Sequence, residues 1–201
     1  MQIRSYRGFS LSCTHLLLLF LFTGGIQKAS AHPHMWIDVQ AKFMLTDSSL
    51  SGFYLYWTFD EMNSAMFTET YDANANGRFE PSEIRKLEDE TLTRVAEGNY
   101  YTAFVWGNKF FKINSIEKFS ATVLPDHRVQ YSFFIPCDIP MENIADKEVS
   151  LFFEDPTMYI AFELQKKMIQ VSSTDRWLGS ISFGKIDYID RIILSLKRAR
   201  R

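Results

Sequence analysis

The sequence contains few residues of the kinds that cross-link, break or loosen a chain. Its 201 residues include two cysteines, nine glycines and six prolines. Cys13 lies within the leader described below, so the remainder has Cys137 alone and cannot form an internal disulfide bond. We find no internal repeat and no low-complexity linker. The chain is therefore expected to form one domain that is held together by packing.

The sequence also lacks an excess of basic residues. Its 22 Lys and Arg are outnumbered by 24 Asp and Glu. The first 31 residues contain three basic residues and no acid, so the net charge falls from −2 to −5 without them. This balance argues against nucleic acid as the main partner. No serine, cysteine or paired-carboxylate arrangement points to hydrolysis. Aromatic residues form 15% of the chain and favour a core rich in β-sheet.

The first residues have the pattern of a secretory signal peptide. Arg4 and Arg7 precede the apolar run "LLLLFLF" at 16–22, and the small-residue triplet Ala-Ser-Ala occupies 29–31. The apolar run is shorter than the roughly 20 residues that cross a bilayer. We predict a leader at 1–31 that directs the protein to the periplasm by the Sec route, with an uncleaved membrane anchor as the alternative.

The remaining sequence predicts strands that are interrupted by two helices. Residues 35–45 and 50–59 alternate as a β-hairpin. Helical spacing of the apolar residues around 59–67 and 84–95 predicts two amphipathic helices, in which we expect Met62 and Met66 to fill the core. Further strands are expected at 104–106, 110–113, 119–124, 129–135, 149–154 and 159–164. This order predicts an α+β fold, mainly antiparallel and sandwich-like, with one β-rich domain at 32–185 and a helical insertion at about 60–97.

The segment "DANANGRFEPSE" between the predicted helices matches the twelve-residue calcium loop of an EF-hand. In this pattern alternate oxygen ligands converge on one ion, a glycine provides the sharp bend, and a glutamate reaches back from the second helix. The residues at the ligand positions are Asp72, Asn74, Asn76, Arg78 through its carbonyl, Glu80 and Glu83, with Gly77 at the bend. We predict a structural Ca²⁺ site in a helix–EF-hand loop–helix insertion. The alternative is an Asx-rich turn that binds no ion.

Two histidines follow the leader. Cleavage after residue 31 would make His32 the first residue, so its α-amine and imidazole could chelate a metal together, with His34 close by. Imidazole suits Zn²⁺, Ni²⁺, Co²⁺ and Cu²⁺. Pro33 excludes the square-planar copper and nickel sites that use deprotonated backbone amides, because proline has no N–H to lose. The alternative is a pair of solvated histidines at a frayed terminus.

Three carboxylates are candidates for completing this site. Asp60 and Glu61 stand at the predicted junction between strand and helix, and Asp155 stands in "FEDPTMY". Asp60 and Glu61 are equally suited to cap the helix, and Asp155 is an ordinary turn residue. His127, in the turn "PDHRV", is interpreted as an exposed structural residue.

The last residues, 186–201, combine apolar and basic side chains. Ile186, Ile189, Ile193 and Leu196 follow helical spacing, and four Lys and Arg residues end the chain. We predict a basic amphipathic helix that rests on an anionic membrane surface or an acidic partner. Basic residues also suit a helix C-terminus that has no partner.

The segments "HPHMWID", "WTFDEMNS", "DANANGRFEPSE" and "EDPTMYIAFEL" together resemble one group of proteins. This is the domain of unknown function family one-thousand-and-seven, also described as the periplasmic component of an uncharacterised ABC-type transport system. The resemblance spans about residues 32–164. It implies an accessory role beside a nickel/cobalt-type membrane metal transporter, and it implies no reaction.

Three functions follow from these patterns. The first is a periplasmic accessory protein for transition-metal (nickel, cobalt or zinc) transport, with a calcium site. The second is a calcium-stabilised interaction module that binds no transition metal. The third is a copper oxidoreductase with a histidine brace, for which only His34 or His127 could supply the second imidazole.

Overall fold

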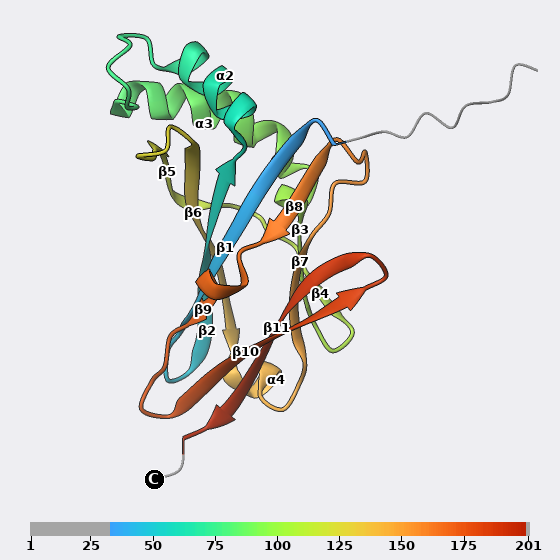
Figure 1. The fold of residues 1–201 in the computed structure, drawn as a ribbon. Helices are drawn as coiled ribbons and strands as arrows, with labels where there is room; N and C mark the ends of the chain where they lie inside the picture. Colours follow the sequence, from blue (N-terminus) through green and yellow to red (C-terminus); the bar gives the residue numbers. More distant parts are fainter. Residues whose placement is uncertain (1–32, 200–201) are drawn as a thin grey trace, which may run out of the picture. The chain divides into compact units, whose positions relative to one another are not determined.

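Two β-sheets form the framework of the protein in the computed structural model, which describes residues 33–199 (Figure 1). The six-stranded first sheet has the order β5-β6-β2-β1-β8, and β9 also pairs with β1. Its strands are β1 (Met35–Leu45), β2 (Ser49–Phe59), β5 (Glu117–Val123), β6 (Val129–Pro140), β8 (Ile160–Leu164) and β9 (Gln170–Val171). The leader predicted at 1–31, together with His32, lies outside the described residues.

The second sheet has five strands in the order β10-β11-β7-β3-β4. These are β3 (Thr102–Trp106), β4 (Lys109–Phe111), β7 (Val149–Phe153), β10 (Trp177–Ile186) and β11 (Ile189–Arg198). The pairings are antiparallel except for β1 with β8 and β9, which are parallel. The predicted antiparallel, mainly β architecture is confirmed.

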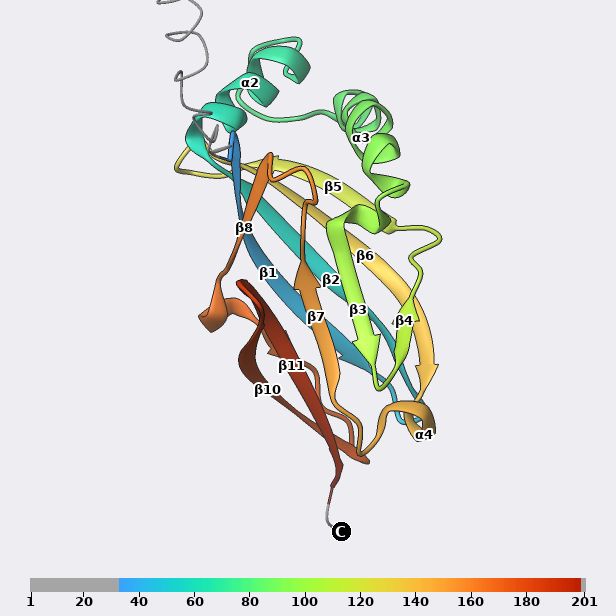
Figure 2. The ribbon, with the colours of Figure 1, turned by 90° about the vertical axis from the view of Figure 1, so that its right-hand side faces the viewer.

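The core lies between the inner faces of the two sheets, which Figure 2 shows one in front of the other. Phe43 of β1 and Phe53 of β2 contact Phe104 of β3, with ring centroids 6.5 and 5.1 Å apart. All three rings are fully buried. Alternation along the strands places these aromatic residues on the inner faces, so the core of the sandwich follows directly from the period-two pattern.

The helices complete the fold. The principal pair, α2 (Glu61–Tyr71) and α3 (Pro81–Ala96), lies at the end of the sandwich where β2 finishes (Figures 1 and 2). Short helical turns are η1 (Asn99–Tyr101), α4 (Met141–Ile144) and η2 (Lys166–Met168). No helix within residues 33–199 is both long and apolar enough to span a membrane.

The face of α2 that is buried differs from the one predicted. Asn63, Ser64, Phe67 and Tyr71 are buried, whereas Met62 and Met66 are 69% and 49% exposed. Two polar residues can occupy this buried face because each has partners. The amide of Asn63 donates to the carbonyl oxygen of His34, and the hydroxyl of Ser64 accepts from the backbone N–H of Val129. The prediction that the two methionines fill the core is wrong.

The C-terminal segment is a strand, so the prediction of a helix in the tail at 186–201 is wrong. β10 and β11 form a hairpin through Asp187, which has a positive φ of 53°. The buried residues Ile192, Leu194 and Leu196 recur at a period of two, and the helical spacing was coincidental. The predicted domain boundary after residue 185 falls inside this hairpin, and the predicted lipid contact loses its helical basis. Lys197 and Arg198 are exposed at the end of β11, and residues 200–201 lie outside the description.

Candidate functional site

The loop between α2 and α3 is curled so that its side-chain oxygens face its own backbone. The carboxylate of Asp72 accepts from the N–H groups of Asn76 and Gly77, at 3.1 and 2.7 Å. The side-chain oxygen of Asn74 accepts from Asn76 at 3.1 Å, and that of Asn76 accepts from Arg78 at 3.0 Å. Side-chain oxygens at alternate residues therefore bend the chain inward.

Glu83, in the first turn of α3, closes the loop from the far side. One oxygen of its carboxylate accepts from the N–H of Ala73 at 2.8 Å, and the other accepts from the N–H of Glu80 at 2.7 Å. A single side chain thus ties the beginning of the loop to the start of α3. Pro81 is in the first turn of this helix, where its missing N–H has no intrahelical partner to lose.

Two carboxylates are buried in this loop. Asp72 and Glu83 are only 7% and 9% exposed. Neither forms an ion pair among the described residues, and their hydrogen bonds come from backbone N–H groups. Burying an ionised carboxylate is costly unless a cation or hydrogen bonds compensate for its lost hydration. Two such groups at the ends of one loop are the reason to consider a cation there, but no three His, Cys, Asp or Glu side chains within residues 33–199, this loop included, are placed to hold one ion.

The remaining loop residues fit the predicted pattern. Gly77 has φ of 79°, a conformation that favours glycine. The exposed side chain of Arg78 lies 3.8 Å from the carboxylate of Glu80, so only its backbone would face an ion. Phe79 is buried in the core and anchors the loop.

His34, the second predicted ligand residue, is exposed immediately before β1. Its backbone N–H donates to the carbonyl oxygen of Tyr159 at 2.8 Å, and its own carbonyl accepts from the side chain of Asn63 at 3.1 Å. Its imidazole lies against the ring of Tyr159, with centroids 5.0 Å apart. The backbone of His34 is therefore held by both α2 and the segment before β8, while its ring nitrogens remain at the surface.

Asp60 organises this region as the N-cap of α2. Its carboxylate accepts from the N–H of Asn63 at 2.9 Å and from the N–H of Trp36 at 2.8 Å. Burial alone would raise the pKa of Asp60, but these hydrogen bonds outweigh it and hold the pKa below the ordinary 3.8. Glu61 is exposed in the first helical turn, where a negative charge is favourable. Of the two roles considered for Asp60, metal ligand and helix cap, its contacts therefore fit the helix cap.

Asp155 plays a similar part in the segment between β7 and β8. Its buried carboxylate accepts from the backbone N–H groups of Thr157, Tyr159 and Ile160, at 2.9, 3.1 and 2.9 Å. The Thr157 hydroxyl also lies 2.7 Å from it. Burial would raise the pKa of Asp155, but these hydrogen bonds lower it below 3.8. Asp155 therefore fixes Tyr159, on which His34 rests.

The structure does not gather the predicted transition-metal ligands into one cluster. Within residues 33–199, no three His, Cys, Asp or Glu side chains are placed so that they could hold one metal ion. Asp60 and Asp155 flank His34 from two sides, but their oxygens are directed at backbone N–H groups. His32 lies outside the described residues. Of the two described histidines, His34 is the one held between α2 and the segment before β8, and His127 lies in the turn between β5 and β6.

The surroundings of His34 are apolar and acidic, a feature that the sequence reasoning missed. The exposed large apolar residues of this end are Trp36, Met62, Met66, Met158 and Tyr159. The segments that form it, 33–36, 59–72 and 153–164, contain no Lys or Arg. Their acidic residues are Asp60, Glu61, Glu69, Asp72, Glu154, Asp155 and Glu163. Acidic residues near Met62 and Met66 could have indicated that these methionines are exposed. Their helical spacing instead favoured the prediction that they are buried.

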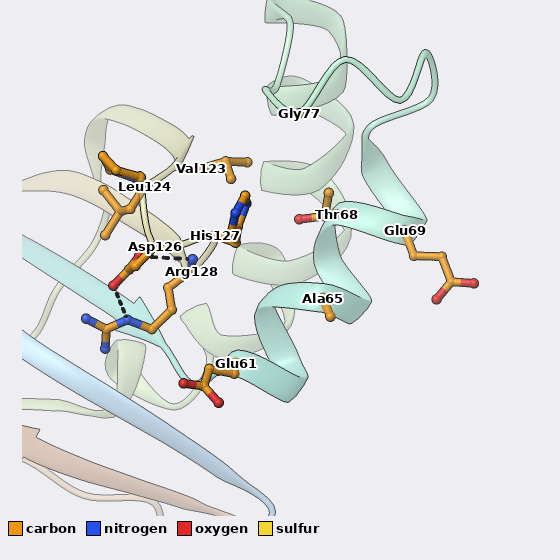
Figure 3. Close-up of a pocket in the computed structure, with 11 residues that line it drawn as sticks. Glu61, Ala65, Thr68, Glu69, Gly77, Val123, Leu124, Asp126, His127 and Arg128 are labelled. Carbon is orange, nitrogen blue, oxygen red and sulfur yellow. Dashed lines mark hydrogen bonds and ion pairs between the residues drawn. The ribbon is translucent and has the colours of Figure 1, made fainter.

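A cleft of about 750 Å³ lies on the other side of α2, against the turn between β5 and β6 (Figure 3). His127 is exposed in this turn with φ of 67°, and its ring faces Thr68. Arg128 pairs with Asp126 at 2.9 Å and with Asp38 at 2.8 Å, which ties the turn to β1. His127 is thus in the exposed turn position predicted for it, on a different side of α2 from the face that contacts His34.

Comparison with known proteins places this arrangement in a family. A family model described as "Protein of unknown function (DUF1007)" matches residues 17–176. The chain belongs to this family. The match includes α2, the loop and α3 and ends just before β10, so the terminal hairpin lies outside it.

Two relatives of this DUF1007 protein carry no assigned function. An uncharacterised protein of Haemophilus influenzae is 29% identical over 157 residues, which cover 77% of this chain and 72% of that protein. An uncharacterised 15.5 kDa protein in the trpE 3′ region of Spirochaeta aurantia is 26% identical over 113 residues, which cover 56% of this chain and 79% of that protein. The family is therefore established, and its activity must be argued from the site.

Proposed function

We propose that this protein is a periplasmic, metal-binding accessory of a transition-metal transport system. His32 and His34 hold the cargo ion, of the Zn²⁺, Ni²⁺, Co²⁺ or Cu²⁺ class, and the 72–83 loop holds a structural Ca²⁺. The observation that carries the proposal is the placement of His34. Its imidazole is exposed, while its backbone is fixed to Asn63 and Tyr159 at an end of the protein rich in acids.

The charge around His34 favours this role. The segments around His34 contain seven acids and no Lys or Arg, and Arg128 in the cleft with Glu61 and Lys86 over Tyr71 offset part of this charge. The remaining excess of acids would raise the local concentration of divalent cations. Two of these carboxylates, Asp60 and Asp155, are engaged as anchors of the backbone around His34, and the proposal does not require them as ligands. The acids attract the ion, and the α-amine and imidazoles hold it.

The same end suits a transporter as partner. Exposed apolar residues on the segments that contact His34 offer a contact surface, and the acids of the same segments suit basic residues on the partner. An anionic lipid surface would be repelled by these acids. The proposed partner is therefore a membrane metal transporter that receives the ion directly at its periplasmic face.

The calcium proposal rests on the two buried carboxylates of the loop. Side-chain oxygens of Asp72, Asn74 and Asn76 already line a tight curl, and Glu83 closes it with both oxygens. This donor set is the one that Ca²⁺ prefers. With three carboxylates and two neutral amides, we expect a dissociation constant of about 10⁻⁵ to 10⁻³ M.

The transition-metal site is tested on protein purified from the periplasm. N-terminal sequencing should give His32 as the first residue, and calorimetry should detect one bound Zn²⁺ or Ni²⁺. His34→Ala should weaken binding at least tenfold, whereas the matched His127→Ala should not change it. Retention of one extra residue before His32 should also weaken binding, because the α-amine moves away from the imidazole. Equal affinity of all four proteins would refute the proposal.

Calcium is tested separately with Glu83→Gln and the neighbouring exposed Glu69→Gln as a control. Calcium should raise the melting temperature of the wild type and of Glu69→Gln, but not that of Glu83→Gln. If calcium does not change the melting temperature of the wild type, the calcium proposal is wrong and the loop is a hydrogen-bonded turn that binds no ion.

A second candidate is a calcium-stabilised interaction module without a transition metal. It is favoured by Asp60 and Asp155, two proposed transition-metal ligands whose carboxylates are engaged by backbone N–H groups. The two candidates differ in one outcome. If His32→Ala/His34→Ala protein still supports metal transport in cells, the second candidate holds and the first fails.

A further inference from the structure

The strand β10 is an edge of the second sheet. Val171 of β9 packs against Gly179 and Lys166 lies over Phe183, but no hydrogen bond within residues 33–199 engages the outward backbone groups of β10 between residues 179 and 185. It is the first strand in the order β10-β11-β7-β3-β4 and has 10 residues, more than the other edge strands of the described sheets. Edge strands are usually short, or carry proline or several charges that prevent pairing with another chain. β10, with the sequence "WLGSISFGKI", contains no proline and a single charge, Lys185.

The open side of β10 presents a defined set of backbone groups. The carbonyl of Arg176 accepts from the N–H of Ala199 at 2.8 Å, so even-numbered residues face β11, and odd-numbered residues face the open edge. Trp177 is not available, because its carbonyl and N–H both bond to Thr174. The residues with outward N–H and C=O groups are therefore Gly179, Ile181, Phe183 and Lys185.

The side chains of the hairpin are unusually apolar for a surface. Leu178, Phe183, Ile186 and Tyr188 are exposed, and Tyr188 is 76% exposed. They form the second group of exposed apolar residues, after the one around His34. Their place on a long unpaired edge points to another β-strand as the covering element.

We propose that two copies of the protein pair through β10 as antiparallel strands, with the two-fold axis at Ser182. In this register Ile181 lies opposite Phe183 of the partner subunit, and Gly179 lies opposite Lys185 of the partner subunit. Every outward N–H and C=O group of both strands then has a partner, which gives about eight hydrogen bonds.

Neighbouring registers leave groups unpaired. An axis at Ser180 or Ile181 requires Trp177, whose groups are already bonded, and an axis at Phe183 places Gly179 opposite Asp187 of the partner subunit, in the turn. The register with its axis at Ser182 is therefore the one that avoids both Trp177 at the start of β10 and the turn at its end.

The side chains agree with the same register. Leu178 lies opposite Ile186 of the partner subunit. The two-fold axis repeats this pair, so the interface contains two such contacts between exposed apolar residues. Arg176 lies opposite Tyr188 of the partner subunit, a pair suited to a cation–π contact. The two Lys185 residues are separated from each other. The apolar surface is therefore self-complementary, as a two-fold interface requires, and no two like charges face each other.

This pairing is independent of metal binding. The hairpin begins where the family match ends at residue 176, and His34 immediately precedes β1 of the other sheet. Failure of the dimer would leave the proposed transport function untouched, and the reverse also holds.

Cysteine cross-linking tests the register. Ser182 faces its own copy across the axis in a non-hydrogen-bonded pair, whose Cα atoms are about 4.5 Å apart, within disulfide range. Ser182→Cys protein should oxidise to a covalent dimer, and the matched Ser180→Cys protein should not. Both variants are made in a Cys137→Ser background, because Cys137 is a free and only partly buried thiol. Cross-linking through Ser180→Cys alone would overturn the register.

Charge substitution tests the dimer itself by analytical ultracentrifugation. Ser182→Lys sets two like charges face to face and should raise the dimer dissociation constant about tenfold, as should Ser182→Glu. A mixture of the two variants should recover a heterodimer. Ser180→Lys, on the same exposed face but opposite Gly184 of the partner subunit, should have little effect. A wild type that stays monomeric up to about 1 mM, or a dimer insensitive to Ser182→Lys, overturns the proposal.

Discussion

Removal of the Asp155 carboxylate should loosen the segment that supports His34. Asp155 accepts hydrogen bonds from the backbone of Thr157, Tyr159 and Ile160, and from the hydroxyl of Thr157. Asp155→Ala removes all of these acceptors at once. Asp155→Asn keeps the shape of the side chain and one acceptor oxygen. Comparison of the two variants therefore separates the contribution of the hydrogen bonds from that of packing.

The magnitude follows from the exposure of the donors. A hydrogen bond to a charged group contributes about 1.5–3 kcal/mol, and a donor left buried without a partner carries a further cost. Thr157 and Tyr159 are exposed, so water can replace their lost bonds, whereas Ile160 is half-buried. We expect Asp155→Ala to lower the free energy of unfolding by about 3 kcal/mol, and Asp155→Asn by about 1 kcal/mol.

Urea unfolding at pH 7, followed by tryptophan fluorescence, measures both values. With a slope of about 2 kcal/mol per molar urea, Asp155→Ala should move the midpoint down by about 1.5 M. A shift below about 0.25 M would refute the reasoning. The folded pKa of Asp155 lies below the ordinary 3.8, so its contribution is present above pH 3.8 and disappears as the pH falls through the folded pKa. The difference between wild type and Asp155→Asn should therefore shrink below pH 3.8.

Four further substitutions test the fold in the same assay. Phe67→Ala, in the buried face of α2, should cost about 3–5 kcal/mol, whereas Met66→Ala should stay within about 0.5 kcal/mol; equal costs would contradict the observed orientation of the helix. Ile192→Ala should cost about 2–5 kcal/mol if β11 belongs to the core, and a neutral result would indicate a detached tail. Gly52→Ala should cost about 1–3 kcal/mol, because a Cβ atom there would lie 2.3 Å from the carbonyl oxygen of Ile135; an unchanged midpoint would show that β2 and β6 can separate.

The sequence predicted the elements whose pattern is local. Alternating residues gave β1 and β2 nearly to the residue, and helical spacing with an Asx-rich loop between gave α2 and α3. The curl of the loop was also predictable, because each position of the motif requires one residue type. Asp72 accepts from backbone N–H groups at the start of the loop, Gly77 takes the positive φ of the bend, and Glu83 reaches back from α3. The actual hydrogen bonds follow that pattern.

The parts that failed depend on distant contacts. Ile189, Ile193 and Leu196 fit a helix as well as a strand, and pairing with β7 and β10 decided in favour of the strand. Met62 and Met66 looked suitable for a core, but Asn63 had a specific acceptor at His34 and so occupies the buried side. Asp60 and Asp155 could not be recognised as backbone anchors, because their partners come from other segments.

The position of β1 in its sheet has a consequence for biogenesis. β1 is the first strand of the described chain, yet it is flanked by β2 on one side and by β8, more than a hundred residues later, on the other. Closure of such distant contacts slows folding, and unpaired strands attract other chains meanwhile. β1 must therefore wait until the chain as far as Leu164 is available before its sheet can close. The incomplete polypeptide should thus depend on a holding chaperone.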